Sequence, residues 1–166
     1  MEKYSKDNKE KVDYVNELAR EAGIECEIFH HEATGKTTSD AEKALGLDSR
    51  QILKCLLLKS RNNEYIAAII RGCDRLNFFA LESFSGYKGL RMAGNEDIAK
   101  ELGFEAGGVP AVIFFKKRIR TFVDEKLLDL EYVVGSGGTP HDGMKFNPKD
   151  LINKLNYEMV NITLNE

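Results

Sequence analysis

Lys54 is the residue whose surroundings most favour a chemical role. It is the only charge in the apolar run Ile52–Leu58, which is short and aliphatic and therefore predicts a buried strand. Side chains alternate along a strand, so Lys54 shares a face with Leu56 and Leu58. An ammonium group on an apolar face must either reach water or meet a partner. Two interpretations remain open: a lysine that extends its head to solvent, or a pocket cation that meets an anionic or carbonyl group.

Two glycine-rich loops could form the rest of a site. These are Gly107-Gly108-Val109-Pro110 and Gly135–Gly143. Glycine lets backbone approach a ligand closely and lets N–H groups converge on an oxygen. Each loop could also be a simple turn between strands. In the second loop, His141 and Asp142 could act as a base and its orienting carboxylate, although adjacent residues rarely point at one another.

Other motifs predict less. Gly35-Lys36-Thr37 resembles the end of a P-loop, but His30 stands where that motif needs a glycine. The run that starts at Gly135 fails as a dinucleotide-binding fingerprint, because Pro140 replaces the last glycine.

Histidines and cysteines do not form a metal or nucleophile motif. His30 and His31 face opposite sides of their predicted strand, and we expect no metal and no cofactor. Cys26, Cys55 and Cys73 are favoured as free thiols.

A basic cluster occurs at residues 116–120, with Lys116, Lys117, Arg118 and Arg120. Such a cluster is usually a solvated hairpin tip. Its functional interpretation is a grip on phosphates, since lysine and arginine neutralise backbone charge without reading sequence.

Composition limits the possible classes of protein. The chain has 166 residues, of which 42% are hydrophobic and 31% charged, with a net charge of −3. These values predict one globular domain over residues 1–166. We see no apolar stretch that could span a membrane and no signal peptide, and expect a cytoplasmic protein. The net charge argues against a broad nucleic-acid-coating face, but not against a protein that grips the end of a strand.

Mixed elements must position these residues. Capping signals and apolar periodicity predict a helix within residues 1–23, which begins near Asp7 and ends at Gly23. The same signals predict further helices and strands. The further helices cover 39–46, 74–86, 95–103 and a segment after Asn147-Pro148; the strands cover 26–31, 52–59, 64–70, 111–115, a segment ending near 123, and 131–135. The expected fold is α/β (α+β): a mixed, partly closed barrel-like sheet flanked by helices.

Taken in order, these landmarks resemble the YbaK/prolyl-tRNA-synthetase-associated editing domain family. The resemblance covers roughly residues 24–155. It rests on these stretches: Thr37-Thr38, Ala41 and Ala44-Leu45-Gly46; Gln51–Leu56; Arg71–Leu76; Gly103–Pro110; Val123-Asp124-Glu125; Val133–Gly137; and Phe146–Leu151.

The resemblance implies a YbaK-like domain that hydrolyses the ester between a wrong amino acid and the 3′ end of a tRNA. Lys54 falls on the family's signature lysine, and Gly107-Gly108 on the loop that positions substrate and water. These three residues are the expected catalytic set. The expected substrate-binding set is His31, Thr38, Pro110, Gly135, Ser136, Gly137, His141 and Asp142. One departure is that Pro110 comes one place early and Ala111 stands where the family loop commonly has proline.

The implied substrate is a tRNA mischarged with a small amino acid such as alanine, cysteine or serine, with tRNA-Pro as one candidate. The implied partners are the tRNA 3′ acceptor end and, as an option, an aminoacyl-tRNA synthetase. Water attack, with backbone N–H groups that stabilise the oxyanion, is favoured over a covalent intermediate. Two alternatives stay open: a non-catalytic module that binds aminoacyl-tRNA ends, and a hydrolase of an unrelated small ester or amide.

Overall fold

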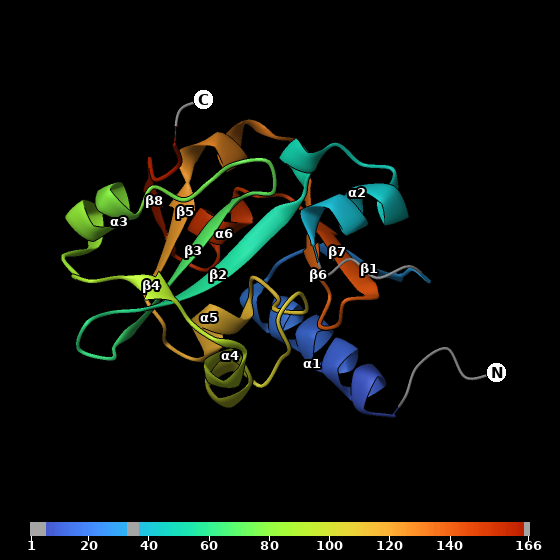
Figure 1. Ribbon diagram of the computed structural model, residues 1–166. Coiled ribbons are helices and arrows are strands. Elements are labelled where there is room, and N and C mark those ends of the chain that lie inside the picture. Colours follow the sequence, from blue (N-terminus) through green and yellow to red (C-terminus); the bar gives the residue numbers. More distant parts are fainter. Residues whose placement is uncertain (1–5, 33–36, 165–166) are drawn as a thin grey trace.

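The computed structural model describes residues 6–32 and 37–164 (Figure 1). Gly35 and Lys36 lie outside these residues. The elements in chain order are α1 (Lys6–Ala22), β1 (Cys26–His30), α2 (Thr38–Leu45), η1 (Ser49–Gln51), β2 (Leu53–Lys59), β3 (Tyr65–Arg71), α3 (Phe78–Ser85), β4 (Arg91–Met92), α4 (Asn95–Leu102), α5 (Ile113–Lys116), β5 (Thr121–Asp124), η2 (Glu125–Asp129), β6 (Val133–Ser136), β7 (Asp142–Phe146), α6 (Asp150–Asn153) and β8 (Glu158–Val160).

The strands form two sheets. A five-stranded mixed sheet has the order β4-β2-β3-β5-β8, and a three-stranded antiparallel sheet has the order β1-β7-β6. An isolated parallel bridge between Ile52 and Val134 links them at the start of β2. The mixed α/β arrangement is confirmed. Within the described residues the sheets do not close into a barrel, because the strand orders leave β4 and β8, and β1 and β6, as edge strands.

Both faces of the five-stranded sheet are covered by apolar side chains. Leu53 and Leu57 belong to the larger core cluster, which α1, α4, α5 and α6 also enter. Leu58 lies on the other face, in a smaller cluster with Leu81 of α3. This two-sided burial explains why β2 is a nearly continuous apolar run, since neither face meets water.

Most predicted elements are confirmed, with shifts at their ends. The helix predicted at 39–46 was expected to open with Ser39 as its cap, but Ser39 lies inside α2. The N-cap is Thr37, whose hydroxyl accepts a hydrogen bond from the Asp40 amide at 3.0 Å. Likewise the helix predicted at 74–86 was expected to be capped by Asp74, but Asn77 caps α3. In both cases a neighbouring side chain of the same capping type made the first position ambiguous in sequence.

The prediction of a strand at 111–115 is wrong. Ile113–Lys116 is the helical turn α5, and Ile113 and Phe114 are fully buried. A short apolar run bounded by turns does not distinguish a strand from a buried helical turn. Tyr157 holds the segment in this shape: its hydroxyl donates to the Ala111 carbonyl at 2.7 Å and accepts from the Phe115 amide at 3.0 Å.

Three strands were not predicted: β4, β7 and β8. The first has two residues and the last three, too short for a period-2 pattern. The sequence of β7, Asp-Gly-Met-Lys-Phe, looks like a continuation of the glycine loop. It becomes a strand because it pairs on both sides, with β1 and with β6. No helix among the described residues is both long and apolar enough to cross a membrane.

Candidate active site

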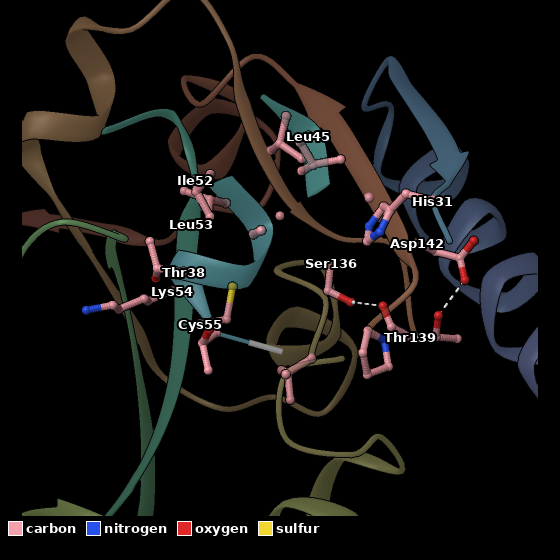
Figure 2. A pocket seen from close by; sticks show the side chains of 18 of the residues that line it. His31, Thr38, Leu45, Ile52, Leu53, Lys54, Cys55, Ser136, Thr139 and Asp142 are labelled. Carbon is pink, nitrogen blue, oxygen red and sulfur yellow. Dashed lines mark hydrogen bonds between the residues drawn. The ribbon is translucent and has the colours of Figure 1, made fainter. Parts of the chain in front are cut away.

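A cavity of about 190 Å³ lies where α2, the start of β2 and the two glycine loops meet (Figure 2). Seven of the predicted site residues line it: His31, Thr38, Lys54, Gly107, Gly135, Ser136 and Asp142. The other four predicted residues, Gly108, Pro110, Gly137 and His141, do not line it. Residues that the sequence did not single out complete the wall, and they include Thr37, Ala41, Leu45, Ile52, Leu53, Cys55, Val109, Val134, Thr139 and Pro140.

One wall of the cavity is polar and is organised around Asp142. Its carboxylate is buried and accepts hydrogen bonds from the Thr139 hydroxyl and from His30 Nδ1, the latter at 3.1 Å. A carboxylate only accepts, so the second contact requires the His30 proton on Nδ1. The register of β1 and β7 places His30 directly opposite Asp142. Sequence reasoning missed both partners.

The predicted His141–Asp142 pair is not what holds the carboxylate. Asp142 points toward His30 and Thr139, whereas the His141 ring lies 6.2 Å from that of His30 and 6.4 Å from that of His31. The three histidines of the chain therefore gather beside Asp142 at the edge of the cavity. The spacing of the histidines in the sequence does not predict this cluster, because the pairing of β1 with β7 brings His30 and Asp142 together.

The rim loop, residues 136–142, is fixed by its own hydrogen bonds. Ser136 Oγ accepts from the Gly138 amide at 3.0 Å, and the Gly137 amide donates to the Asp142 carbonyl at 2.7 Å. The Thr139 hydroxyl also accepts from the His141 amide at 3.0 Å. These bonds give the loop a defined shape, so Gly137 and His141 contribute to the rim without lining the cavity.

The opposite wall is apolar. Ala41 and Leu45 reach it from α2, and Ile52 and Leu53 from the start of β2. Cys55 also lines this wall, and burial raises the pKa of its thiol to about 12. A thiol with this pKa stays protonated near neutral pH, which makes it a poor nucleophile.

Lys54 lies at the end of the cavity away from Asp142. Figure 2 shows its amino group pointing away from His31, Ser136 and Asp142. Its Nζ donates to the Asp74 carbonyl at 2.9 Å, and the side chain is half-buried. An ammonium group has three donors, so this bond leaves capacity for a ligand. The structure thus gives Lys54 a protein partner in addition to a place on the cavity wall.

The turn at residues 71–74, which accepts the hydrogen bond from Lys54, is itself stabilised by an ion pair. Arg71 contacts both carboxylate oxygens of Asp74, at 2.7 and 3.0 Å. Burial acts to raise the pKa of Asp74, but the hydrogen bonds and charge of Arg71 together bring it below its usual value. Gly72 lies between these residues, where a Cβ would come within 2.5 Å of Thr38 Cγ2. This turn therefore connects α2, β2 and Lys54.

The two adjacent glycines of the first loop differ in role. Gly107 lines the cavity with a positive φ of 83°. The Gly108 amide already donates to the Glu105 carbonyl at 2.9 Å, and a Cβ there would lie 3.2 Å from Thr139 Cα. Gly108 therefore lets the two loops pack closely. Among the described residues, the amides of Gly107 and Val109 have no acceptor, and both residues line the cavity.

No group of three or more His, Cys, Asp or Glu side chains within residues 6–32 and 37–164 is placed to hold a metal ion. The arrangement instead offers an apolar wall, a polar wall with a buried carboxylate, backbone amides and a lysine. This combination suits binding of a small polar molecule with an apolar part.

The fold and site define a YbaK-like α/β domain. Residues 32–154 match the family model of the aminoacyl-tRNA editing domain, and the chain belongs to this family. The match takes in the whole cavity except His31.

Curated relatives are proline–tRNA ligases. The chain is 33% identical to the enzyme of Thermotoga maritima over 99 residues, which are 59% of this chain and 17% of the ligase. It is 24% identical to that of Trichlorobacter lovleyi over 133 residues, 80% of this chain and 23% of the ligase. The chain therefore spans only a small part of these ligases.

Solved structures share the fold. One is a hypothetical protein with a TM-score of 0.83 and 24% identity, with 90% of this chain and 99% of that chain covered. Another is described as a candidate trans-editing enzyme for prolyl tRNA synthetase, with a TM-score of 0.83, 24% identity, and 93% and 98% of the two chains covered. At this identity the likeness shows the fold alone.

Proposed function

We propose that this protein is an aminoacyl-tRNA deacylase that hydrolyses the ester of a mischarged tRNA. The observation that carries the proposal is the cavity itself: an apolar wall faces a polar one, and Gly107 and Val109, whose amides have no acceptor among the described residues, line it. Membership of the aminoacyl-tRNA editing domain family supports the terminal ester of a tRNA as the substrate class. The proline–tRNA ligase relatives favour tRNA-Pro, and the solved structure described as a candidate trans-editing enzyme favours editing in trans.

The reaction needs no covalent enzyme intermediate. A water oxygen attacks the ester carbonyl carbon, the bond to the ribose oxygen breaks, and that oxygen takes a proton to restore the tRNA hydroxyl. The amides of Gly107 and Val109 can donate to the oxyanion, an effect worth roughly 3–4 kcal/mol per donor at comparable sites. Lys54 would hold the terminal phosphate or the carbonyl oxygen. This assignment moves the second oxyanion donor from Gly108 to Val109, because the Gly108 amide is occupied.

Cavity size supports a small amino acid. The volume of about 190 Å³ is close to that of engineered cavities that admit one benzene molecule, roughly 150 Å³. An aminoacyl group with a side chain the size of alanine, cysteine or serine fits such a space. Bulkier side chains would have to displace Leu45, Ile52 or Val134, which line it.

The decisive experiment offers the purified protein a panel of tRNAs mischarged with alanine, serine, cysteine and larger amino acids. The variant Lys54→Met keeps the apolar stem and removes the charge. We expect hydrolysis of a small-residue ester by the wild type, and a loss of about tenfold or more in kcat/KM for the variant. Lys149→Ala, on the exposed N-cap of α6, is the matched control. Absence of hydrolysis across the panel, or full activity in Lys54→Met, would contradict the proposal.

A second candidate is a non-catalytic module that binds aminoacyl-tRNA ends. The observation that favours it is Ala111, which stands where the family loop commonly has proline. Binding of the tRNA end without turnover would support this candidate. Turnover of a small ester without any dependence on tRNA would instead indicate the third class, an unrelated hydrolase. A cytoplasmic location and a synthetase partner belong to the same proposal, because the substrate is made by synthetases.

A further inference from the structure

The end of the five-stranded sheet opposite the cavity carries a group of basic residues that the proposed chemistry does not use. The cavity adjoins β2 over its first four residues, Leu53–Leu56, whereas Lys59 is the last residue of that strand. Three to six residue steps along a strand correspond to about 10 to 20 Å. In Figure 1, β2 runs from α2 toward the β2–β3 hairpin at the lower left.

Strand register places basic segments side by side at this end. Lys59 pairs with Arg91 of β4 on one side and with Tyr65 of β3 on the other. Ala67 pairs in parallel with Thr121, which puts Tyr65 beside Ile119. Three strand-to-strand steps span about 14 Å. The hairpin tip, the loop before β4 and the turn after α5 therefore lie along one edge.

Five exposed cations extend from these segments, and none of their side chains has a partner among the described residues: Arg61, Lys88, Lys116, Lys117 and Arg118. The backbone beneath them is fixed. The Arg61 amide donates to the Lys88 carbonyl at 2.8 Å, and the amide of Arg118, whose φ is 56°, donates to the Phe115 carbonyl at 3.2 Å. We call these five residues the basic edge.

Nearby acids are largely neutralised by other residues. Asp97 lies 3.5 Å from Lys59 Nζ and accepts from the Tyr65 hydroxyl, and Glu158 is paired with Arg120 at 2.7 Å. Glu64, Glu82 and Glu101 remain at this end, with Glu82 accepting from the Leu90 amide at 2.9 Å, and Lys117 borders a depression that Asp7 and Glu10 also line. Arg91 adds a further cation, because among the described residues its guanidinium donates only to the Ser60 carbonyl and the Asn63 side-chain oxygen. Together with Arg91, the five cations of the basic edge outnumber these acids, although the whole chain carries a net charge of −3.

We infer that the basic edge binds the phosphate backbone of the double-helical acceptor stem of the tRNA whose 3′ end enters the cavity. This inference rests on the proposed function. Lysine and arginine contact phosphates without reading sequence, and double-stranded RNA is recognised mainly through its backbone and shape. The separation of about 10 to 20 Å along β2 suits a substrate that continues beyond its reactive end. A small ester would never reach this surface.

The test measures binding of a tRNA transcript with an intact 3′ end at several salt concentrations, from about 50 to 200 mM. Each phosphate contact that is removed should lower the slope of log affinity against log salt by about one. We therefore expect Lys116→Ala/Lys117→Ala and Arg61→Ala/Lys88→Ala each to lower the slope by about two and to weaken binding about tenfold. Thermal melts check that each variant is folded.

Arg20→Ala/Lys154→Ala removes two exposed cations that do not belong to the basic edge and is the matched control, with no change expected. A single-stranded oligonucleotide with the 3′ terminal sequence separates this surface from the cavity, since both double variants should bind it like the wild type. Hydrolysis of mischarged tRNA tests the proposed function separately. If no hydrolysis occurs but both double variants still lower the salt slope, the proposed function fails and the inference that the basic edge binds tRNA is retained. Slopes equal to the control in both double variants, or a wild type that binds no tRNA, would overturn the inference.

Discussion

At the scale of single residues, the site depends on how each polar group is held. Asp142 is buried, and its carboxylate is satisfied by Thr139 and His30. Lys54 is satisfied in part by the Asp74 carbonyl. Polar groups that have such partners keep one orientation, which a site that positions a ligand requires.

Cys55 provides a prediction at this scale. Because burial raises the pKa of its thiol from 9.0 to about 12, the thiolate is about a thousandfold rarer than for an ordinary cysteine at the same pH. We expect iodoacetamide near pH 8 to modify the exposed Cys73 and to leave Cys55 unmodified, as read by mass spectrometry.

Activity provides the second half of the same test. Cys55→Ala should keep hydrolysis within a few-fold of wild type, and Cys73→Ser serves as the labelling control. Rapid alkylation of Cys55, or abolished turnover in a folded Cys55→Ala protein, would show that the thiol takes part in the chemistry.

At the scale of elements, α1 braces both glycine loops. The Tyr14 ring stacks on that of Phe104 at 6.5 Å, just before the first loop. In the rim loop, Gly138 approaches α1 so closely that a Cβ would lie 3.1 Å from Val15 Cγ2 and 3.2 Å from the Lys11 carbonyl oxygen. The loops in turn pack on each other at Gly108. A helix far in sequence from the cavity thus sets the shape of its rim.

Gly138→Ala tests this brace. Gly138 has a φ of 121° as well as the close contacts, so alanine should cost about 1–3 kcal/mol from backbone strain and overpacking together. Urea unfolding measures the loss, and kcat/KM should fall because the rim moves.

Gly86→Ala is the matched control for this variant. It also places alanine at a positive φ, 82°, but nothing lies within 4 Å of the new Cβ. It should therefore lose about 1–2 kcal/mol from strain alone and retain activity. Equal effects of the two variants on activity would refute the role of α1.

At the scale of the whole molecule, several ionisable groups favour the protonated form in the folded state. The pKa of Tyr65 is raised to about 12, first by its hydrogen bond to Asp97, and burial raises the pKa of Tyr157 as well as that of Cys55. Above the ordinary pKa values of 9.0 and 10.0, the unfolded chain releases protons that the folded protein keeps. Stability must then fall as pH rises.

We expect the urea midpoint to decrease steadily from about pH 9 toward pH 12. Tyr65→Phe removes one of the three groups, so its midpoint should depend less steeply on pH than that of the wild type. A midpoint that is constant or that rises over this range would show that these groups are not protonated preferentially in the folded protein.

The sequence predicted what local patterns encode. The β2–β3 hairpin, α1 with its end at Gly23, and α4 followed by Gly103 were visible as periodicity, caps and turn residues. The family could also be recognised, because its motifs are short runs in a fixed order. The segment 111–115 could not be assigned, since its helical turn depends on Tyr157, more than forty residues later. That residues 1–166 form one domain stays a prediction.

The candidate site also has features that the sequence determines and features that only the tertiary structure decides. By itself the sequence determined which residue types are present: a lysine in an apolar strand, two glycine loops and a carboxylate near the second. Only the tertiary structure decided their partners, because these contacts join residues far apart in the chain. His30 meets Asp142 across 112 positions, and Lys54 meets the Asp74 carbonyl across 20. Hydrogen-bond partners follow from three-dimensional packing, which no local pattern contains.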